Sequence, residues 1–434
     1  KYFEREAEGF SMEKLFDSFY NGGGYQMASF MNLITYFPEF RLNEGWKSTA
    51  TIRLDRLSKD LVRDDGTYLE ATSGYADGVL GTFTTAIELA RKADIPLSDE
   101  FMERYEKFAR YIMGTATPLG KEPDWGDGGA ASVRNRIYGC GEILDDEEML
   151  YFGSAGGEGK TPSYTSVYFP DGKIAAMRTG WNEDDAYAFI IGRVGSSHSH
   201  THTMALEAYA YGRYLLTDTG MTSYVTTHPH FMWQRTRAAA HNTVEINETS
   251  PQAPFNETGA SLSQADMKLN ETFDFFSGVT EGTEGYKHYR NVLFLKNRKM
   301  WLVSDYIYDI NGTVPVNHYT QNWHMISDAK PSVDPETLAG RSNYSTGANI
   351  QVVPVKDENM SARLADGIAM QPGANARDTA EAQYIEFAKD VAGDGSFDTV
   401  LYPTKNNYGA ANISTERIAM PVTPEKASAY RIKA

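Results

Sequence analysis

Residues 1–115 alternate apolar and polar positions with the period of an α-helix. A helix is expected over residues 78–93 and another over 97–114, where Ser98 stands at the N-cap position and Gly114 at the end. Apolar residues recur three and four positions apart in two further stretches, at Met12, Leu15, Phe16 and Phe19 and at Leu54, Leu57 and Leu61. Long consecutive helices with short connections predict a layer of packed α/α hairpins.

Beyond residue 164 the pattern becomes that of β-strands. Short apolar or alternating runs are separated by turn residues, and they cover residues 173–181, 187–194, 204–220, 242–247, 291–310 and 318–325. Such a series of strands predicts a large antiparallel domain, most simply a sandwich of two sheets. Two stretches rich in glycine and proline, 119–135 and 153–163, are interpreted as the connection between the halves. We therefore place two domains at residues 1–150 and 160–434.

The composition narrows the classes of partner. The chain has 434 residues, which suits two domains, and its net charge of −17 argues against nucleic acid and anionic membrane surfaces as partners. A local basic cleft on such a protein can still bind an anionic substrate. The single cysteine, Cys140, excludes an internal disulfide and a cysteine-based metal site. No apolar run is long enough to span a membrane, and the sequence does not decide the oligomeric state.

Three of the nine histidines lie at alternate positions, at His198, His200 and His202. Alternate residues of a strand point to one face, so we expect the three rings to line one surface. Three interpretations are open: a hydrogen-bonded row, a zinc site built on neutral imidazoles, and a carboxylate clamp or proton relay. A hairpin would return Asp218 to the row, and His241 begins a later strand, so these two residues complete a candidate metal set.

This region resembles the β-sandwich signature of the heparinase II/III-like polysaccharide lyases. The family pattern is His-x-His-x-Asp, two apolar strands around a glycine, Asp-x-Gly, and later His-Asn-Thr. In SHSHTHTMALEAYAYGRYLLTDTG, His198 and His200 match the two histidines and Asp218 matches the aspartate. In RAAAHNTVEIN, His241 matches the last element. His202 stands where the family usually has an acidic residue. The segment YKHYRNVLFLKNRKMWLVSDYI also resembles the strands that follow in the family.

The helical half resembles the family as well. The segment DDGTYLEATSGYADGVL matches the family segment that carries the catalytic tyrosine, which gives Tyr75 that role. The histidine that often follows this tyrosine is Ala76 here. Asn21 lies 54 positions upstream, where these lyases use an asparagine or histidine to neutralise the substrate carboxylate. Because the family's helical toroid is longer, the resemblance implies an incomplete (α/α) toroid, truncated at its N-terminus and followed by the large antiparallel β-sandwich.

The resemblance implies β-elimination at a 4-O-linked uronic acid. The C5 proton is weakly acidic beside the carboxylate, so the enzyme has to neutralise that group and stabilise the enolate-like charge. Asn21 and His198 are the candidates for this role, and Tyr75 is the candidate base or acid. The plainer interpretations are a cap or turn residue for Asn21, a packing residue for Tyr75 and an outer partner of a metal ligand for His198.

Further residues are assigned to binding. The resemblance implies that His200, Asp218 and His241 hold a structural Zn²⁺, because elimination needs no metal-activated water; the alternative is a hydrogen-bonded cluster that stiffens the sandwich. His202 is a candidate additional ligand or hydrogen-bond partner. The candidate substrate contacts are Glu70, Arg235, Arg237 and Tyr224. The stretch DWGDGG, residues 124–129, lacks the spacing of a calcium loop and is interpreted as a linker turn.

Three functions stay open on the sequence. The leading one is a polysaccharide lyase acting on an anionic polysaccharide or oligosaccharide, and the others are a non-catalytic glycan-binding protein of the same fold and a zinc-dependent hydrolase. Alginate, heparan, chondroitin, hyaluronan, glucuronan and gellan-like chains all remain candidate polymers, and endo or exo action is undetermined. Because the chain starts at Lys1 rather than at methionine, we expect the processed product of a secreted or periplasmic protein.

Overall fold

The computed structural model describes residues 16, 20–70, 72–192, 198–228, 230–249, 264–357, 359–371, 379–406, 413–421 and 429–433. The first helices are α2 (Asn21–Tyr36), α3 (Asn43–Leu61), α4 (Ser73–Ala93), α5 (Asp99–Thr115), α6 (Arg134–Leu144) and α7 (Glu147–Gly153). The helices expected over 78–93 and 97–114 are α4 and α5, and the Ser98 hydroxyl caps α5 by accepting from the Phe101 amide. Of the stretch from Met12 to Phe19, only Phe16 lies within the described residues. None of the described helices is long and apolar enough to cross a membrane.

The described strands form four sheets, and every pairing is antiparallel. A five-stranded sheet contains, in order, β1 (Val167–Phe169), β2 (Ile174–Arg178), β3 (Tyr187–Ile191), β4 (Leu206–Ala210) and β5 (Arg213–Leu216). An eight-stranded sheet contains β12 (Ser332–Val333), β13 (Gly340–Arg341), β14 (Asn349–Pro354), β17 (Gly395–Thr404), β10 (Met300–Asp309), β9 (Tyr286–Leu295), β8 (Phe273–Thr280) and β7 (Ala265–Leu269). A four-stranded sheet contains β15 (Met360–Met370), β16 (Thr379–Val391), β11 (Asn317–Trp323) and β6 (Val244–Ile246), and β18 (Ser414–Arg417) pairs with β19 (Tyr430–Lys433).

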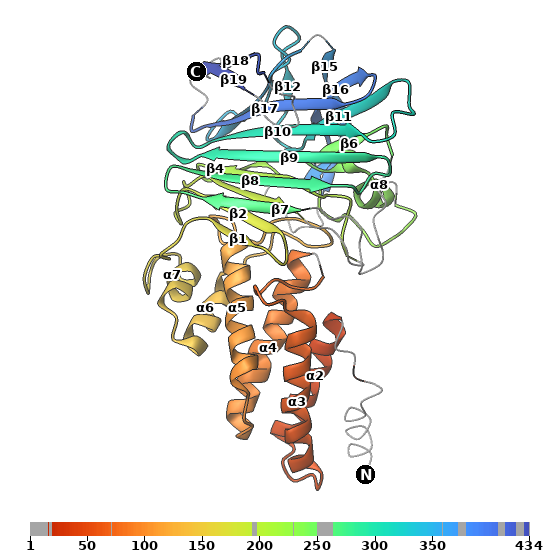
Figure 1. Ribbon diagram of the computed structural model, residues 1–434. Helices are drawn as coiled ribbons and strands as arrows, with labels where there is room; N and C mark the ends of the chain where they lie inside the picture. Colours follow the sequence, from red (N-terminus) through yellow and green to blue (C-terminus); the bar gives the residue numbers. More distant parts are fainter. Residues whose placement is uncertain are drawn as a thin grey trace.

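The five-stranded sheet is buried on both faces. Ala176 and Phe189 pack into the core of the helical layer, whereas Ala175 and Ile190 pack into the core of the sandwich. Strands covered on both sides carry apolar residues at consecutive positions, which explains the runs IAAM and YAFII. Figure 1 shows helices α2 to α7 gathered on one side of the stacked strands. The predicted fold class, an incomplete helical toroid followed by a large antiparallel sandwich, is confirmed.

A buried arginine joins the two layers. Arg178 of β2 donates to the carbonyl oxygens of Gly114 and Ala116, where α5 ends, and the Tyr187 hydroxyl donates to the carbonyl of Thr115. The arginine charge faces the negative end of the α5 dipole, which favours this position for a cation. The described helices of the first layer end at residue 153 and β1 begins at residue 167. The exact domain limits, 150 and 160, stay a prediction.

Candidate active site

The site lies where the helices meet the sandwich, and three parts of the chain build it. Tyr75 occupies the first turn of α4. The DWGDGG stretch, residues 124–129, is held against this turn because the Ser73 and Thr72 hydroxyls donate to carbonyl oxygens of Pro123 and Trp125. The loop between β3 and β4 is joined to the same stretch through the backbone, since the amide of residue 127 donates to the carbonyl of residue 198 at 3.0 Å.

Tyr75 and His198, predicted from different halves of the chain, are in contact. Their rings stack with centroids 4.0 Å apart and planes 20° from parallel. The Tyr75 hydroxyl lies 3.0 Å from the hydroxyl of Tyr224, a predicted substrate contact whose side chain is 43% exposed. The stacked pair is therefore reachable from solvent at the tyrosine end. Stacking fixes the orientation of both rings, which is the first requirement of a positioned proton donor or acceptor.

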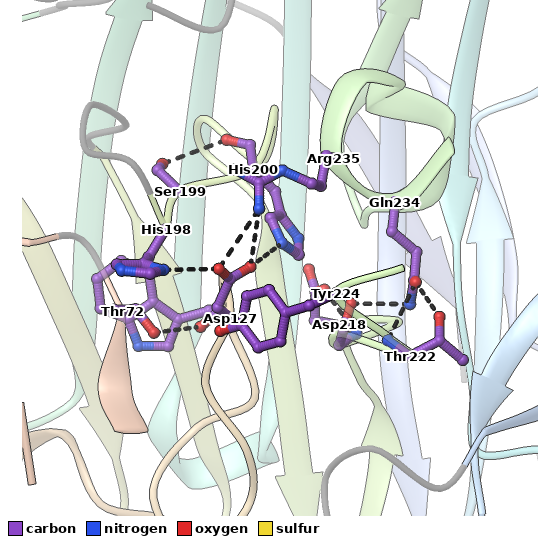
Figure 2. Close-up of polar contacts among 12 residues, drawn as sticks. Thr72, Asp127, His198, Ser199, His200, Asp218, Thr222, Tyr224, Gln234 and Arg235 are labelled. Atoms are coloured by element: carbon purple, nitrogen blue, oxygen red, sulfur yellow. Dashed lines mark hydrogen bonds and ion pairs between the residues drawn. The ribbon is translucent and has the colours of Figure 1, made fainter. Parts of the chain in front are cut away.

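Asp127 is a site residue that the sequence pattern did not indicate. Its Oδ2 atom lies 2.7 Å from Nδ1 of His198, and its Oδ1 atom lies 2.9 Å from Nε2 of His200 (Figure 2). Arg235 approaches the same carboxylate at 3.4 Å. Burial alone would raise the pKa of Asp127, but the hydrogen bonds of the two histidines and the charge of Arg235 outweigh burial and hold the pKa well below its usual range. The DWGDGG stretch is thus part of the site, and its interpretation as a linker turn was wrong.

The histidine stretch is a loop, so the prediction of an extended strand was wrong. Residues 198–202 lie between the end of β3 and the start of β4. Their backbone bonds go elsewhere, because the Thr201 amide donates to the Arg235 carbonyl and the His202 carbonyl accepts in a turn. The rings consequently form no single row. His198 turns toward Tyr75, while His202 and its neighbour His200 face a later part of the chain.

His200, His202 and His241 form a buried cluster with the dimensions of a metal site. Each ring offers a nitrogen within 4.8 Å of those of the other two, and none of the three side chains is exposed. Nδ1 of His200 and both nitrogens of His202 have no hydrogen-bond partner among the described residues. Burial is the main cause that lowers the pKa of His200 and, much further, that of His202, so both rings are neutral at neutral pH. Neutral imidazoles with unused nitrogens fit a zinc ion.

Asp218 reaches this cluster by the predicted hairpin. Tyr211 and Gly212, which connect β4 to β5, have φ values of 53° and 80°, as a tight two-residue turn requires. Oδ2 of Asp218 lies 2.7 Å from Nδ1 of His241, and Oδ1 accepts from the Gly220 amide at 3.0 Å. The three predicted ligands are therefore close together, with His202 added to them. That they bind a metal stays a prediction.

Two buried polar side chains hold the backbone around the cluster. Asn242, which follows His241, donates to carbonyl oxygens of β4 and of the residue before Asp218, at 2.8 and 3.0 Å. Arg290 of β9 donates to the carbonyl oxygens of Met204 and Asn242, and it forms a two-point ion pair with Asp305 of β10. The eight-stranded sheet thus supports the loops that carry the histidines.

The remaining predicted substrate contacts have protein partners of their own. Glu70 is buried and accepts from the Tyr68 hydroxyl at 3.0 Å; burial raises its pKa, and the charge of His198 opposes this rise. Arg237 makes two hydrogen bonds of 2.7 Å to Glu245. The electrostatic interaction with His198 places Glu70 near this histidine, and the pairing with Glu245 balances the charge of Arg237. Their roles toward a substrate stay predictions.

Asn21 is the first residue of α2. This helix runs parallel to α4, because Gly24 packs against Thr82 and Thr35 donates to a carbonyl oxygen near the end of α4. The N-terminal ends of α2 and α4 therefore lie at the same end of the helical layer. Asn21 consequently begins α2 on the side where Tyr75 begins α4, and its part in the reaction stays a prediction.

Comparison with known families agrees with the resemblance in the sequence. The family described as "Heparinase II/III-like, C-terminal" matches residues 161–416, and "Heparinase II/III N-terminus" matches residues 11–152. A heparin-sulfate lyase of Pedobacter heparinus is 22% identical over 85% of this chain and 55% of its own length. A heparin-sulfate lyase of Bacteroides thetaiotaomicron is 22% identical over 95% of this chain and 62% of its own length. The chain thus spans less than two thirds of these curated relatives.

Solved structures share the fold. The crystal structure of a heparan sulfate lyase from Pedobacter heparinus superposes with a TM-score of 0.81 at 18% identity, over 95% of this chain and 64% of that one. A crystal structure of heparinase III superposes with a TM-score of 0.82 at 17% identity, over 96% of this chain and 68% of that one. Both the helical layer and the sandwich therefore have counterparts in these structures.

Proposed function

The chain belongs to the heparinase II/III-like family, and from that premise we propose that it is a polysaccharide lyase that cleaves a uronic-acid-containing glycosaminoglycan by β-elimination. The observation that carries the proposal is the stacked pair of Tyr75 and His198 at the junction of the two layers. The names of the relatives, both heparin-sulfate lyases, support heparan sulfate as the first polymer to test. The expected secreted or periplasmic location suits a substrate of that kind.

In the proposed reaction the C5 proton of the uronic acid leaves first. Asn21, at the start of α2, donates its side-chain amide to the substrate carboxylate and so stabilises the negative charge that develops there. His198 assists from the sandwich side, with its orientation fixed by Tyr75 on one face and by Asp127 at Nδ1. Tyr75 makes one of the two proton transfers that elimination requires, as base at C5 or as acid at the leaving oxygen, and His198 makes the complementary transfer. The C4–O bond then breaks, and a C4–C5 double bond remains in the product.

In this proposal a metal ion has a structural role and not a catalytic one. The residue set expected from the resemblance is His200, Asp218 and His241, and the unpartnered Nδ1 of His200 supports a ligand role for that residue. When bound, zinc would link the β3–β4 loop to the segments after β5 and before β6. His200 also contacts Asp127, and Asp127 contacts His198. A metal that fixed the position of His200 would therefore also restrict the position of His198.

A panel of uronate polymers tests the proposed reaction. The double bond left by elimination is conjugated to the carboxylate and absorbs in the near ultraviolet, whereas binding and hydrolysis produce no such absorbance. We expect the absorbance to rise with heparan sulfate, and other glycosaminoglycans, alginate, glucuronan and gellan-like chains extend the panel. Polymer shortening without any absorbance would favour the zinc-dependent hydrolase, and binding without shortening would favour the glycan-binding protein.

Asp127→Asn is expected to lower turnover by about tenfold or more, because partners that orient a functional histidine typically contribute that much. His198 and His200 contact different oxygens of Asp127, and asparagine replaces one of these oxygens by an NH2 group, so one of the two rings loses its acceptor and its fixed orientation. Initial rates of absorbance increase give the measurement. Asp77→Asn is the matched control, since Asp77 also lies on the chain near Tyr75 but pairs with Arg136 instead. Equal rates for the two variants would contradict the role given to Asp127.

A further inference from the structure

A cavity of about 700 Å³ lies beside α8 (Phe231–Thr236) and the paired strands β15 and β16. Pockets that bind small molecules usually have about 300–1,000 Å³, so the cavity has the size of a ligand site. We call it the α8 cavity. The described residues that line it include His230, Trp233, Asp366, Gly367, Glu381 and Gln383. None of these six residues belongs to the candidate active site or to the histidine cluster.

Trp233 supplies a fixed aromatic surface in the α8 cavity. Its half-buried indole ring packs against His324 and Tyr384, with ring centroids 6.0 and 6.2 Å away. These two rings stack on each other with centroids 4.3 Å apart. A Cβ atom at Gly367 would come within 3.0 Å of the indole, so the glycine allows the ring to lie close to β15. A ring held in this way can receive the C–H face of a sugar at little cost in conformational freedom.

Two carboxylates give the α8 cavity a negative charge. Asp366 and Gln383 face each other across β15 and β16, and the Gln383 amide donates to Oδ1 of Asp366 at 3.0 Å. Glu381, on the same strand as Gln383, is exposed. No lysine or arginine is among the described residues that line the cavity, and Arg363 of β15 makes two hydrogen bonds to Glu386. Carboxylate oxygens accept hydrogen bonds, so they suit the hydroxyl groups of a sugar.

The same carboxylates disfavour anionic groups. A sulfate or carboxylate in the α8 cavity would face Asp366 and Glu381 without a lysine or arginine to balance its charge, and contacts between like charges select against such a ligand. In a glycosaminoglycan the uronic acid is charged at neutral pH, whereas an N-acetylated hexosamine without sulfate is not. The cavity therefore suits the hexosamine, and the candidate active site is left for the uronic acid.

We propose that the α8 cavity is a binding subsite for an uncharged N-acetylhexosamine unit, which stacks on Trp233 and donates hydroxyl hydrogen bonds to Asp366 and Glu381. Helix α8 links this subsite to the candidate active site, because Arg235, two residues after Trp233, approaches the carboxylate of Asp127. The inference rests on the proposed function for the class of glycan. It adds that chains without sulfate on the hexosamine are bound best.

Calorimetric titration with two matched trisaccharides tests the subsite in the unaltered protein. One is the trisaccharide of N-acetylglucosamine, and the other is the same trisaccharide with a sulfate on each O6 atom. Neither contains a uronic acid, so neither can undergo the proposed elimination. We expect saturable binding of the uncharged trisaccharide and at least about tenfold weaker binding of the sulfated one. No binding of the uncharged trisaccharide, or equal or tighter binding of the sulfated one, would overturn the inference.

Glu381→Gln tests the effect of the charge at nearly constant size. The uncharged trisaccharide should bind about fivefold more weakly, because a charge-assisted hydrogen bond becomes a neutral one, while the sulfated trisaccharide should bind more tightly. Glu88→Gln is the matched control, since Glu88 is exposed on α4 and does not line the cavity. This control loses the same charge and should keep both affinities. Affinities in Glu381→Gln equal to those of the control would contradict the subsite.

Trp233→Leu tests the aromatic surface. We expect the affinity for the uncharged trisaccharide to fall at least about tenfold, because the stacking surface is lost. Thermal melting checks the fold of the variant. An unchanged affinity in a folded Trp233→Leu protein would place the binding elsewhere and overturn the inference, and if this variant does not fold, Glu381→Gln decides.

The outcome can be separated from that of the lyase proposal. A protein that makes the ultraviolet-absorbing product but does not bind the uncharged trisaccharide refutes the subsite and leaves the lyase proposal standing. A protein that binds this trisaccharide through Trp233 and Glu381 but makes no such product does the reverse.

Discussion

Tyr75→Phe is expected to lower turnover at least about 100-fold, the usual contribution of a positioned proton-transfer group. The substitution removes only the hydroxyl, which lies at the partly exposed end of the stack and contacts the hydroxyl of Tyr224. The ring remains to stack on His198, so the fold and the position of the histidine should be kept. The measurement is the initial rate of unsaturated product formation on the best polymer, with thermal melting as the check of folding.

Tyr36→Phe is the matched control for this change. Tyr36 ends α2, is 55% exposed and lies at the opposite end of that helix from Asn21, so its loss should leave the rate unchanged. A well-folded Tyr75→Phe protein with the rate of the unaltered enzyme would show that another group transfers the proton. The stacking of Tyr75 on His198 would then be a packing contact only.

Asn21→Ala is expected to lower turnover by about 100-fold, because a donor to the developing negative charge is removed. No side chain caps the N-terminus of α2 with a hydrogen bond, and Asn21, its first residue, is only partly buried. The substitution should therefore cost little stability. The effect should appear in kcat more than in KM, since the charge that Asn21 stabilises grows toward the transition state. Initial rates over a range of polymer concentrations give the two constants.

Asn32→Ala provides the control on the same helix. Its side chain donates to the backbone carbonyl of Ala28 and is exposed, so it has no access to the junction that holds Tyr75. Equal rates for Asn21→Ala and Asn32→Ala would show that Asn21 is a terminal residue of α2 without a part in the reaction.

Much of the fold was predictable because local pattern and final structure agree. The helix from Asp99 begins at the capping serine that the sequence indicated. The β4–β5 hairpin turns at Tyr211 and Gly212, within the predicted strand pair. The strands around Ala175 and Phe189 were also recognisable, although their double burial was not, because an apolar run does not say what covers each face.

The site was predictable only in part. Asp218 could be assigned to the cluster because a hairpin is a local structure that returns the chain to its neighbour. Asp127 could not be assigned to the site, because its partners His198 and His200 lie 71 and 73 residues later in the sequence. It also lies in a glycine-rich stretch whose pattern predicts a turn. The strand at 198–202 was misjudged for the same reason. Its backbone partners, residue 127 and Arg235, are supplied by the tertiary structure and replace a neighbouring strand.

The most direct test of the central claim is the mass of the product formed from heparan sulfate in oxygen-labelled water. Elimination breaks the C4–O bond without consuming water, so the account predicts oligosaccharides with an unsaturated uronic acid at the new non-reducing end. These products are one water molecule lighter than hydrolysis products, and they carry no labelled oxygen when they are analysed before the new reducing end exchanges its oxygen with the solvent. Saturated products that contain the label would contradict the account, because they would show that the chain cleaves its substrate with water.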